Sequence, residues 1–303
     1  MKKLFVCIVL LALLSGCVDT IEDTGYTFED SLGRNVTVSS CDRTAVLLGS
    51  YTDLWMLAGG DVCATADDAW DDYDINLPEY AVNLGGTENL SLEKLISAEP
   101  DFVIATSKRK QHIDWKPTLE AMGISVAYFD VNDFDGYLEM LDICTDITGR
   151  KDLYQKNGLD IRDRIGDTLA GAEEKYTGDS YLLLRASATY IRAKKSEGTV
   201  LGEMLTDFGC VNIADSEEGI LENLNIESII ACNPKHIFIV QAGDNPEGMK
   251  KAVENMFSEN PVWQELDAFK NGRIHFMDKK LFNFKPNSRW GEAYVELEKA
   301  LSR

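Results

Sequence analysis

The sequence is poor in histidine and lacks the short motifs that mark the commonest catalytic sites. Only three of its 303 residues are His, whereas protein sites for free zinc or manganese usually need several. No G-x-S-x-G, G-x-x-x-x-G-K-S/T, G-x-G-x-x-G or H-E-x-x-H pattern occurs in it. We therefore expect no resident metal ion, no cofactor and no enzyme of a familiar class.

Positive charge is also scarce, because 30 Lys and Arg stand against 51 Asp and Glu, for a net charge of −21. A chain this acidic is not expected to bind nucleic acid, whose phosphates need a basic face. The acidic pairs Asp67-Asp68 and Asp71-Asp72 could bind calcium weakly or mimic a catalytic dyad, but adjacent carboxylates rarely converge on one substrate.

None of the seven cysteines lies in a C-x-x-C motif, which argues against a zinc or thioredoxin-like site. Cys7 and Cys17 fall at the N-terminus, so an odd number remains in the body of the chain. We expect all five of these to be buried as small hydrophobic side chains. A disulfide between Cys41 and Cys63, each near the start of a predicted strand, is the alternative.

Only one apolar run suggests a membrane, and it is too short to span one comfortably. Lys2 and Lys3 precede an apolar run over residues 4–14, which ends in Leu-Ser-Gly-Cys at Cys17. This pattern predicts a secretory signal over residues 1–16. The ending resembles a bacterial lipobox, which implies that Cys17 is lipidated and that residues 17–25 form a tether to the membrane; an ordinary cleaved signal is the alternative.

Cleavage there would remove two lysines and shift the net charge from −21 to −23. The remaining length suits two domains in an extracytoplasmic location.

Two stretches, 134 residues apart, repeat the same pattern. Residues 89–100 read Asn-Leu-Ser-Leu-Glu-Lys-Leu-Ile-Ser-Ala-Glu-Pro, and residues 223–234 read Asn-Leu-Asn-Ile-Glu-Ser-Ile-Ile-Ala-Cys-Asn-Pro. The spacing predicts a short helix, with Ser91 or Asn225 as its N-cap and a proline stopping it. The apolar runs that follow predict buried parallel strands.

Glu93 and Glu227 occupy equivalent positions in the first turn of the two predicted helices. A negative charge there interacts favourably with the helix dipole, and this is the purely structural interpretation of both residues. A second, weaker repeat has an offset of 148 residues instead of 134. The difference indicates that the first copy carries 14 extra residues within 68–88. The repeat predicts two similar lobes, each presenting one Glu in the same local setting.

The middle of the chain loses its strand signals and becomes helical. We expect one helix over about residues 135–148 and a longer one within 150–176, before strand signals return at residues 180–184. The predicted fold class is α/β. Two Rossmann-like lobes with central parallel sheets, residues 26–134 and 177–303, would be joined by a helical connector over residues 135–176.

Four blocks, in this order, resemble the substrate-binding proteins of the ATP-binding-cassette (ABC) importers for iron chelates, haem and corrinoids. They are residues 30–38 (Asp-Ser-Leu-Gly-Arg-Asn-Val-Thr-Val), residues 92–104, residues 209–215 and residues 223–239. The resemblance covers roughly residues 26–303. The sequence departs from the family pattern just before Arg43 and just after Pro234, and neither departure falls at the expected docking positions.

The resemblance implies a monomer that binds a small metal chelate in the cleft between its lobes and passes it to a permease dimer. In such proteins one Glu on each lobe meets Arg residues of the permease, and these positions correspond to Glu93 and Glu227. Two like charges on symmetric lobes suit a two-fold partner, and charges at an interface rim mainly set orientation and on-rate.

Three basic segments follow predicted strands and hold 11 of the 30 Lys and Arg: residues 106–112, 185–195 and 279–289. A basic, aromatic-lined cleft would attract an anionic chelate, because Arg pairs with carboxylates and Lys offers a point charge. Lys110, Lys195 and Lys279 are expected to be solvated surface charges. The candidate ligand contacts are Tyr51, Trp70, Lys108, Arg109, Arg185, Arg192, Lys280, Phe282 and Arg289.

A ferric siderophore is the expected ligand, since cationic side chains suit an anionic iron chelate. Haem is second, with His112 as a candidate axial ligand against the commoner role of a solvated loop histidine. A corrinoid is third. His236, His275, Trp115 (beside Pro117 at a predicted helix start) and Trp290 are expected to be structural. A lipid-anchored surface enzyme or adhesin is the alternative function.

Overall fold

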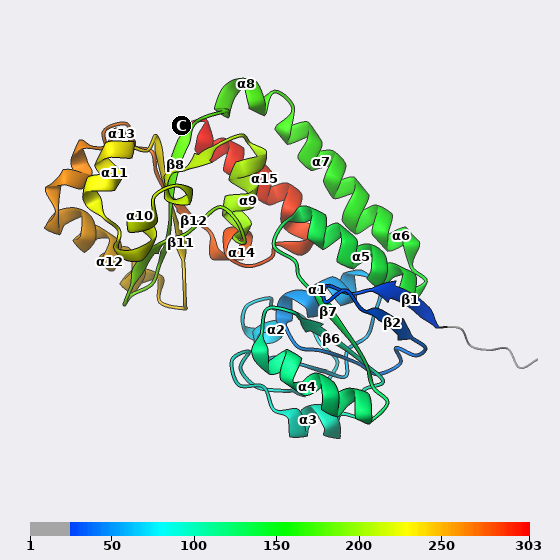
Figure 1. Ribbon diagram of the computed structural model, residues 1–303. Helices are drawn as coiled ribbons and strands as arrows, with labels where there is room; N and C mark the ends of the chain where they lie inside the picture. Colours follow the sequence, from blue (N-terminus) through cyan, green and yellow to red (C-terminus); the bar gives the residue numbers. More distant parts are fainter. Residues whose placement is uncertain (1–24) are drawn as a thin grey trace, which may run out of the picture.

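The computed structural model describes residues 25–303, so the expected signal segment, the lipidation site Cys17 and most of the tether lie outside the described residues. Two α/β lobes are joined by a run of helices (Figure 1). Within residues 25–303, none of the helices combines the length and the apolar character needed to cross a membrane.

The N-terminal lobe (N-lobe) is built on a five-stranded parallel sheet in the order β5-β4-β3-β6-β7. β6 lies inside the sheet between β3 and β7, and every residue in it is buried, as the apolar run after Pro100 predicts. A separate antiparallel hairpin of β1 and β2 packs beside β7. The elements are β1 (Tyr26–Glu29), β2 (Asn35–Val38), β3 (Thr44–Val46), α1 (Gly49–Leu57), β4 (Ala64–Thr65), α2 (Asp68–Asp71), β5 (Val82–Asn83), α3 (Leu92–Ser97), β6 (Phe102–Thr106), α4 (Lys110–Ala121) and β7 (Ser125–Phe129).

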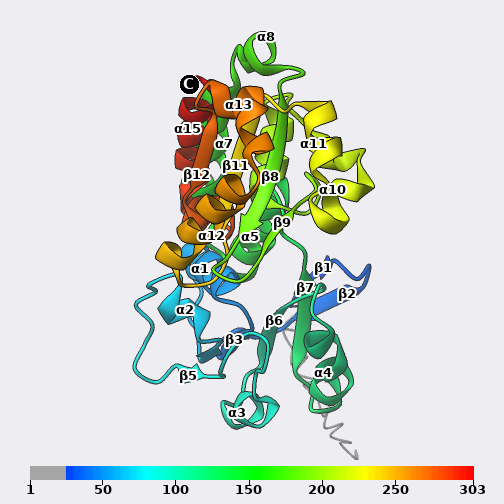
Figure 2. The same cartoon turned by 90° about the vertical axis from the view of Figure 1, so that its left-hand side faces the viewer.

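The C-terminal lobe (C-lobe) has a second parallel sheet in the order β10-β8-β11-β12, with β9 antiparallel to β8 (Figure 2). β8 and β11 are buried almost throughout, in keeping with the leucines of β8 and the β-branched and aromatic residues of β11. The elements are β8 (Ser180–Ala186), β9 (Ile191–Ala193), α9 (Val200–Asp207), β10 (Val211–Asn212), α10 (Glu218–Asn223), α11 (Ile226–Cys232), β11 (His236–Gln241), α12 (Pro246–Glu259), α13 (Asp267–Lys270), β12 (Ile274–Met277), α14 (Lys279–Phe282) and α15 (Trp290–Leu301).

The two copies of the repeat have the predicted structure. The Ser91 hydroxyl accepts a hydrogen bond from the Lys94 N–H at 3.2 Å, and Asn225 Oδ1 accepts one from the Ser228 N–H at 3.0 Å. Both helices end before their proline, and each feeds a central buried strand. The α/β class with two lobes, predicted from the repeat, is confirmed.

The connector comprises four helices rather than two: α5 (Phe134–Thr148), α6 (Lys151–Tyr154), α7 (Asp160–Leu169) and α8 (Ala172–Tyr176). Gly149 ends α5 with φ 70°, a left-handed conformation that glycine adopts at little cost. Gly158 lies in a π-helical turn, Gln155–Leu159, where a Cβ atom would come 3.0 Å from Leu138. The second connector helix is therefore interrupted by close packing against the first.

The helical connector is not an isolated rod, because α15 packs along α7. Trp290, the first residue of α15, is fully buried against Phe134 and Tyr137 of α5, with ring centroids 5.9 and 6.5 Å apart. One hydrophobic cluster continues from the N-lobe through these helices into the C-lobe. This shared core limits free movement of the lobes about the connector.

Two local predictions were wrong. α4 begins at Lys110, so Pro117 lies inside this helix and Trp115 is a buried residue in its middle rather than at a helix start. The five described cysteines are all free, and Cys41 is only partly buried. The expected burial holds for Cys63, Cys144 and Cys210, while Cys41 and Cys232 are intermediate.

Candidate ligand-binding site between the lobes

A pocket lies between the lobes, where β7, β8 and β11 end. This is the carboxyl edge of both sheets, the usual position of ligands in open α/β folds. The pocket encloses about 180 Å³, and about 680 Å³ when its open mouth is included. We call it the interlobe pocket; it is lined by Val131, Asn132, Leu183, Leu184, Arg185, Lys194, Gly198, Thr199, Val200, Leu201, Val240, Phe282, Asn283 and Lys285.

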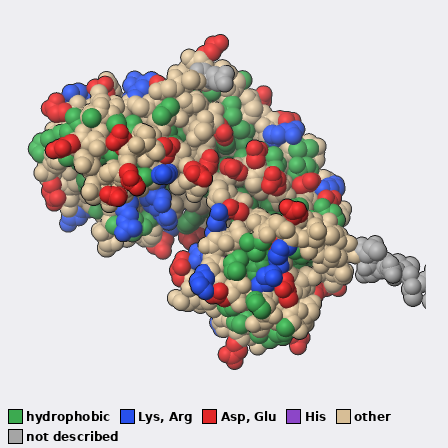
Figure 3. Space-filling view, viewed as in Figure 1, with side chains coloured by type: hydrophobic (Ala, Val, Ile, Leu, Met, Phe, Trp, Pro, Cys, Tyr) green, Lys and Arg blue, Asp and Glu red, His purple; other side chains and the backbone are tan. Residues whose placement is uncertain are grey.

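The lining of the interlobe pocket carries three cations and no carboxylate. Arg185, Lys194 and Lys285 have no acidic partner within 4.0 Å among the described residues. Figure 3 shows Lys and Arg side chains gathered on the C-lobe beside the gap to the N-lobe, on a surface otherwise rich in Asp and Glu. In a chain of net charge −21, this concentration of unpaired positive charge indicates an anion-binding site.

Arg185 and Arg192 stand opposite each other in the antiparallel pairing of β8 with β9. Like charges at directly opposed positions destabilise a sheet, unless something between them neutralises the repulsion. Both side chains are exposed, and the Arg192 guanidinium lies 5.4 Å from the centroid of the Tyr190 ring. Two guanidinium groups on one face of the sheet are suited to hold a carboxylate or another planar anion, and of the two only Arg185 lines the interlobe pocket.

The N-terminus of α9 opens into the same pocket. Thr199 is its N-cap residue, but the Thr199 hydroxyl donates to the carbonyls of Lys195 and Ser196 instead of accepting from the helix. The first N–H groups of α9 therefore lack a side-chain cap, and the helix dipole places partial positive charge there. This arrangement adds to the attraction for an anion.

Tyr51 is 1% exposed, and its hydroxyl donates to the Phe129 carbonyl at 3.1 Å. Burial raises the pKa of Tyr51 to about 12. Lys285 of the C-lobe reaches this ring, with its Nζ 5.7 Å from the ring centroid. Tyr51 is thus a buried residue that does not line the interlobe pocket itself but supports Lys285, which does.

The candidates on the N-lobe lie outside the interlobe pocket. Lys108 is 2.7 Å from Asp130, and Arg109 is 2.7 Å from Glu88 and also donates to the Thr87 carbonyl. The two basic residues line a separate hollow near the start of α4. Trp70, in α2, is half-buried and does not line the interlobe pocket.

The candidates after β12 have different surroundings. Phe282 is buried and lines the interlobe pocket. Lys280 is 2.7 Å from Asp74 across the gap between the lobes. Arg289 makes a bidentate pair with Glu292 at 2.8 and 2.9 Å and lines a different hollow, beside β12 and α15.

Lys279 is not the solvated surface charge that the sequence suggested. Its side chain is 19% exposed, and its Nζ lies 2.6 Å from Asp244 and 3.3 Å from Asp72 of the other lobe. The expectation failed because the acidic loop that meets Lys279 is more than 200 residues away in the sequence.

All three histidines are buried, so His112 is not a solvated loop residue either. His112 is fully buried in α4, where its Nδ1 accepts a hydrogen bond from the Thr106 N–H at 3.2 Å. His236 and His275 form a buried pair, with Nδ1 and Nε2 3.1 Å apart on neighbouring strands, in line with the expected structural role. Burial lowers the pKa of each of the three to about 4.

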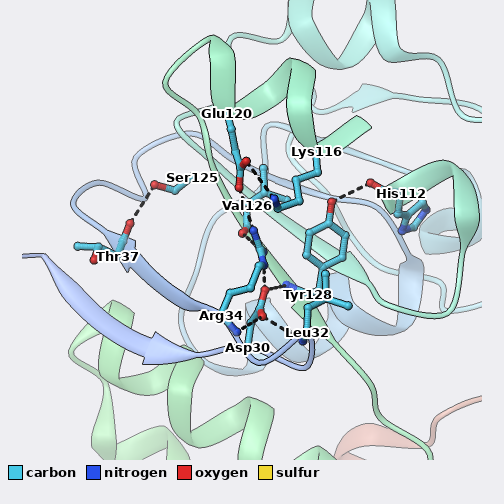
Figure 4. Close-up of polar contacts among 10 residues, drawn as sticks. All are labelled: Asp30, Leu32, Arg34, Thr37, His112, Lys116, Glu120, Ser125, Val126 and Tyr128. Atoms are coloured by element: carbon cyan, nitrogen blue, oxygen red, sulfur yellow. Dashed lines mark hydrogen bonds and ion pairs between the residues drawn. The ribbon is translucent and has the colours of Figure 1, made fainter. Parts of the chain in front are cut away.

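The Asp-x-x-Gly-Arg block at residues 30–34 serves the fold (Figure 4). The buried Asp30 carboxylate pairs with Arg34 at 2.5 Å and accepts from the backbone N–H groups of Leu32, Arg34 and Tyr128. Arg34 also donates to the Val126 carbonyl and lies over the Tyr128 ring. These contacts fasten the first hairpin to β7, the strand that leads into the interlobe pocket.

Glu93 and Glu227 are both exposed in the first turns of α3 and α11. These helices lie at the ends of the two lobes that are farthest from the connector (Figure 1). Within the described chain, neither carboxylate has a basic partner within 4.0 Å. Both side chains are therefore accessible to a partner protein.

Two lining residues, Lys194 and Lys285, were not singled out from the sequence, although both fall in the basic segments. The available signal was the charge density of those segments. It does not show which side chains point inward, because neighbouring Lys residues such as Lys194 and Lys195 face different surroundings.

The two-lobe fold, with its helical connector and a pocket between the lobes, defines a class of substrate-binding proteins. Residues 45–281 match the family described as periplasmic binding protein, and the chain belongs to that family. The family works with ABC importer permeases, binds small ligands outside the cytoplasm and consists of transport proteins rather than enzymes.

Relatives with known roles are distant. The high-affinity heme uptake system protein IsdE of Staphylococcus aureus is 19% identical over 212 residues, covering 68% of this chain and 70% of that protein. S. aureus SirA complexed with staphyloferrin B has a TM-score of 0.70 at 17% identity, over 91% of this chain and 98% of that chain. The vitamin B12 binding protein BtuF of Vibrio cholerae has a TM-score of 0.67 at 20% identity, over 86% and 96%.

Proposed function

We propose that this chain captures an anionic metal chelate, with a ferric siderophore as the first choice, and delivers it to the permease of an ABC importer. The observation that carries the proposal is the interlobe pocket, with three unpaired cations and no carboxylate in its lining. Catecholates and carboxylates, the groups that hold iron in siderophores, are anions that Lys and Arg bind well. The structure of SirA with staphyloferrin B supports the proposal as a similar fold that binds such a molecule.

Haem is the second candidate, supported by the relative that takes up haem. Haem iron in proteins is usually held by His, Cys, Met or Tyr, and none of these residue types lines the interlobe pocket. A siderophore needs no such ligand, because it saturates its own iron. A corrinoid is third, since Phe282 is the one aromatic side chain in the described lining.

Delivery would use Glu93 and Glu227 as the contacts with the two permease subunits. Their exposure and their equivalent positions in the repeat support this assignment. Each carboxylate would meet a basic residue of the partner at the rim of the interface, which orients the two proteins.

The proposal also includes secretion through residues 1–16 and a lipid on Cys17 that holds the protein at the membrane. It rests on the residues of that segment alone, which precede the described part of the chain. Mass spectrometry of protein extracted from membranes should find diacylglycerol on an N-terminal Cys17. A chain that begins elsewhere or carries no lipid would refute this part of the proposal.

The ligand proposal is tested by incubating the protein separately with ferric catecholate, haemin and cobalamin and recording absorption spectra after removal of free ligand. We expect the ferric catecholate to co-purify in saturable amounts and cobalamin to wash away. Retention of haemin alone would make haem the ligand. Retention of none of the three would overturn the ligand ranking while leaving the family intact.

A further inference from the structure

The segment Lys279–Asn287 of the C-lobe, which we call the bridging segment, is fastened to the N-lobe at its first end by charge. Lys279 Nζ lies 3.3 Å from Asp72 Oδ1, and Lys280 Nζ lies 2.7 Å from Asp74 Oδ2. Both acids belong to the region in which the N-lobe carries its extra residues. The extra loop therefore reaches across to the other lobe.

The other end of the bridging segment is fastened by a buried amide. Asn287 is fully buried, and its Nδ2 donates to the Ser50 carbonyl and to Asp53 Oδ2, both at 2.8 Å. Between the two ends, the Phe284 ring packs on Tyr73 of the N-lobe, with centroids 5.7 Å apart. Contacts of three kinds thus hold the segment against the N-lobe.

Lys285 lies between these anchors and lines the interlobe pocket, and its Nζ is 5.7 Å from the centroid of the Tyr51 ring. No carboxylate of the described residues lies within 4.0 Å of it. A partly buried ammonium without a counter-charge has lost hydration that nothing replaces. Burial lowers the pKa of Lys285, and Arg109 lowers it further, while Asp130 and Asp68 act in the opposite direction.

We infer that Lys285 is the charge-selecting residue of the interlobe pocket: the bridging segment holds its ammonium in place before the ligand arrives, and an anionic chelate supplies the counter-charge that the protein omits. A neutral chelate of the same size leaves the ammonium unpaired and binds more weakly. This inference rests on the proposed function, because it assumes that the interlobe pocket is where the chelate binds.

The inference has a signature in pH that a purely structural role would not produce. An anion beside Lys285 raises the pKa of the ammonium, so affinity for an anionic chelate falls as pH rises through the pKa of the free protein. Two other titratable groups near it change protonation in different pH ranges: burial raises the pKa of Tyr51 to about 12 and the pKa of Asp68 to about 6. Arg185 and Arg109 are the neighbouring cations.

Two further charges, Lys194 of the pocket and Asp130 near Lys285, complete the set of charges that affect this pH profile. The variant Lys285→Met separates the two lysines, because it keeps Lys194. Only the part of the alkaline fall in affinity that belongs to Lys285 should then be lost.

The test measures binding of two ferric probes by quenching of intrinsic tryptophan fluorescence: a trianionic ferric tris-catecholate and a neutral ferric tris-hydroxamate. We expect Lys285→Met to weaken binding of the tris-catecholate by about 10- to 100-fold and to leave the tris-hydroxamate nearly unchanged. Lys285→Arg should restore most of the affinity and move the alkaline fall to higher pH. Lys195→Met removes the same charge from an exposed position in the basic segment 185–195 and serves as the control.

The outcomes separate the inference from the proposed function. If the wild-type protein binds the tris-catecholate, but Lys285→Met binds it equally well or weakens both probes to the same extent, the inference is wrong and the proposed function stands. If the wild-type protein binds no anionic chelate, both are wrong. Thermal unfolding of each variant shows whether any loss of binding is a loss of folded protein.

Discussion

The paired arginines of the β8–β9 hairpin lead to a prediction in which stability and binding change in opposite directions. Arg185 and Arg192 are directly opposed in the sheet register, and no carboxylate of the described chain neutralises either one. Repulsion between like charges at such positions costs about 0.2–1 kcal/mol. The lower part of this range applies here, because both side chains are exposed and salt screens them.

The perturbation is Arg192→Gln. Without ligand, the variant should be more stable than the wild type by a few tenths of a kcal/mol, roughly 1 °C in Tm for a protein of this size. With an anionic chelate, the loss of charge-assisted hydrogen bonds worth about 1.5–3 kcal/mol should weaken binding about 10- to 150-fold. The gain in Tm should shrink at high salt.

The assay is differential scanning calorimetry at low and high salt, combined with a fluorescence titration with the ferric tris-catecholate. Arg162→Gln, on the exposed face of α7 with a single acid at 3.6 Å, is the control for loss of one surface guanidinium. A less stable Arg192→Gln with unchanged affinity would refute the idea that the two arginines are held together for an anion.

Three further predictions test other parts of the structure. Asp30→Asn should destabilise the protein by about 2 kcal/mol, measured by urea unfolding, because the neutral amide loses the charge-assisted contact with Arg34, which keeps only the more exposed Glu120 as its acid; a change under about 0.5 kcal/mol would contradict this. Glu93→Ala combined with Glu227→Ala should leave chelate affinity intact and abolish uptake in cells, and normal uptake would show that the docking assignment is wrong. Burial lowers the pKa of His275 from 6.5 to about 4, so stability that is present above pH 6.5 should be lost as pH falls towards 4. The variant His275→Gln should lose less stability over that range. Equal acid sensitivity in both proteins would count against the buried pair.

The fold could be predicted because its strongest signals are local. N-caps, prolines and apolar periodicity around residues 89–105 and 223–239 determine a helix followed by a buried strand in each copy, and the repetition itself predicts two lobes. The end of α5 was also readable, since Gly149 adopts a left-handed conformation that glycine favours.

The details that the sequence did not predict depend on contacts between distant residues. Gly158 interrupts the second connector helix because it packs against Leu138, and periodicity within the helix cannot show that. Pro117 predicts a helix start nearby, but α4 begins earlier, at Lys110, and continues through the proline. A proline costs a helix one hydrogen bond, and the packing of Trp115 and Leu119 against the sheet outweighs that cost.

The candidate site was predicted at the level of segments and only partly at the level of residues. Arg185 and Phe282 line the interlobe pocket, whereas Lys280 and Arg289 pair with acids elsewhere. The difference is set by which basic residues meet a carboxylate from another part of the chain. Lys285 is left unpaired because the acids of the extra loop meet Lys279 and Lys280 instead.

The most direct measurement is anomalous diffraction at the iron edge from crystals of the protein grown with the ferric tris-catecholate. Our account predicts one strong iron peak inside the interlobe pocket, with oxygen atoms of the chelate in contact with Arg185 and Lys285. An iron peak on an outer face of either lobe, or a pocket left empty while the chelate binds saturably in solution, would contradict it.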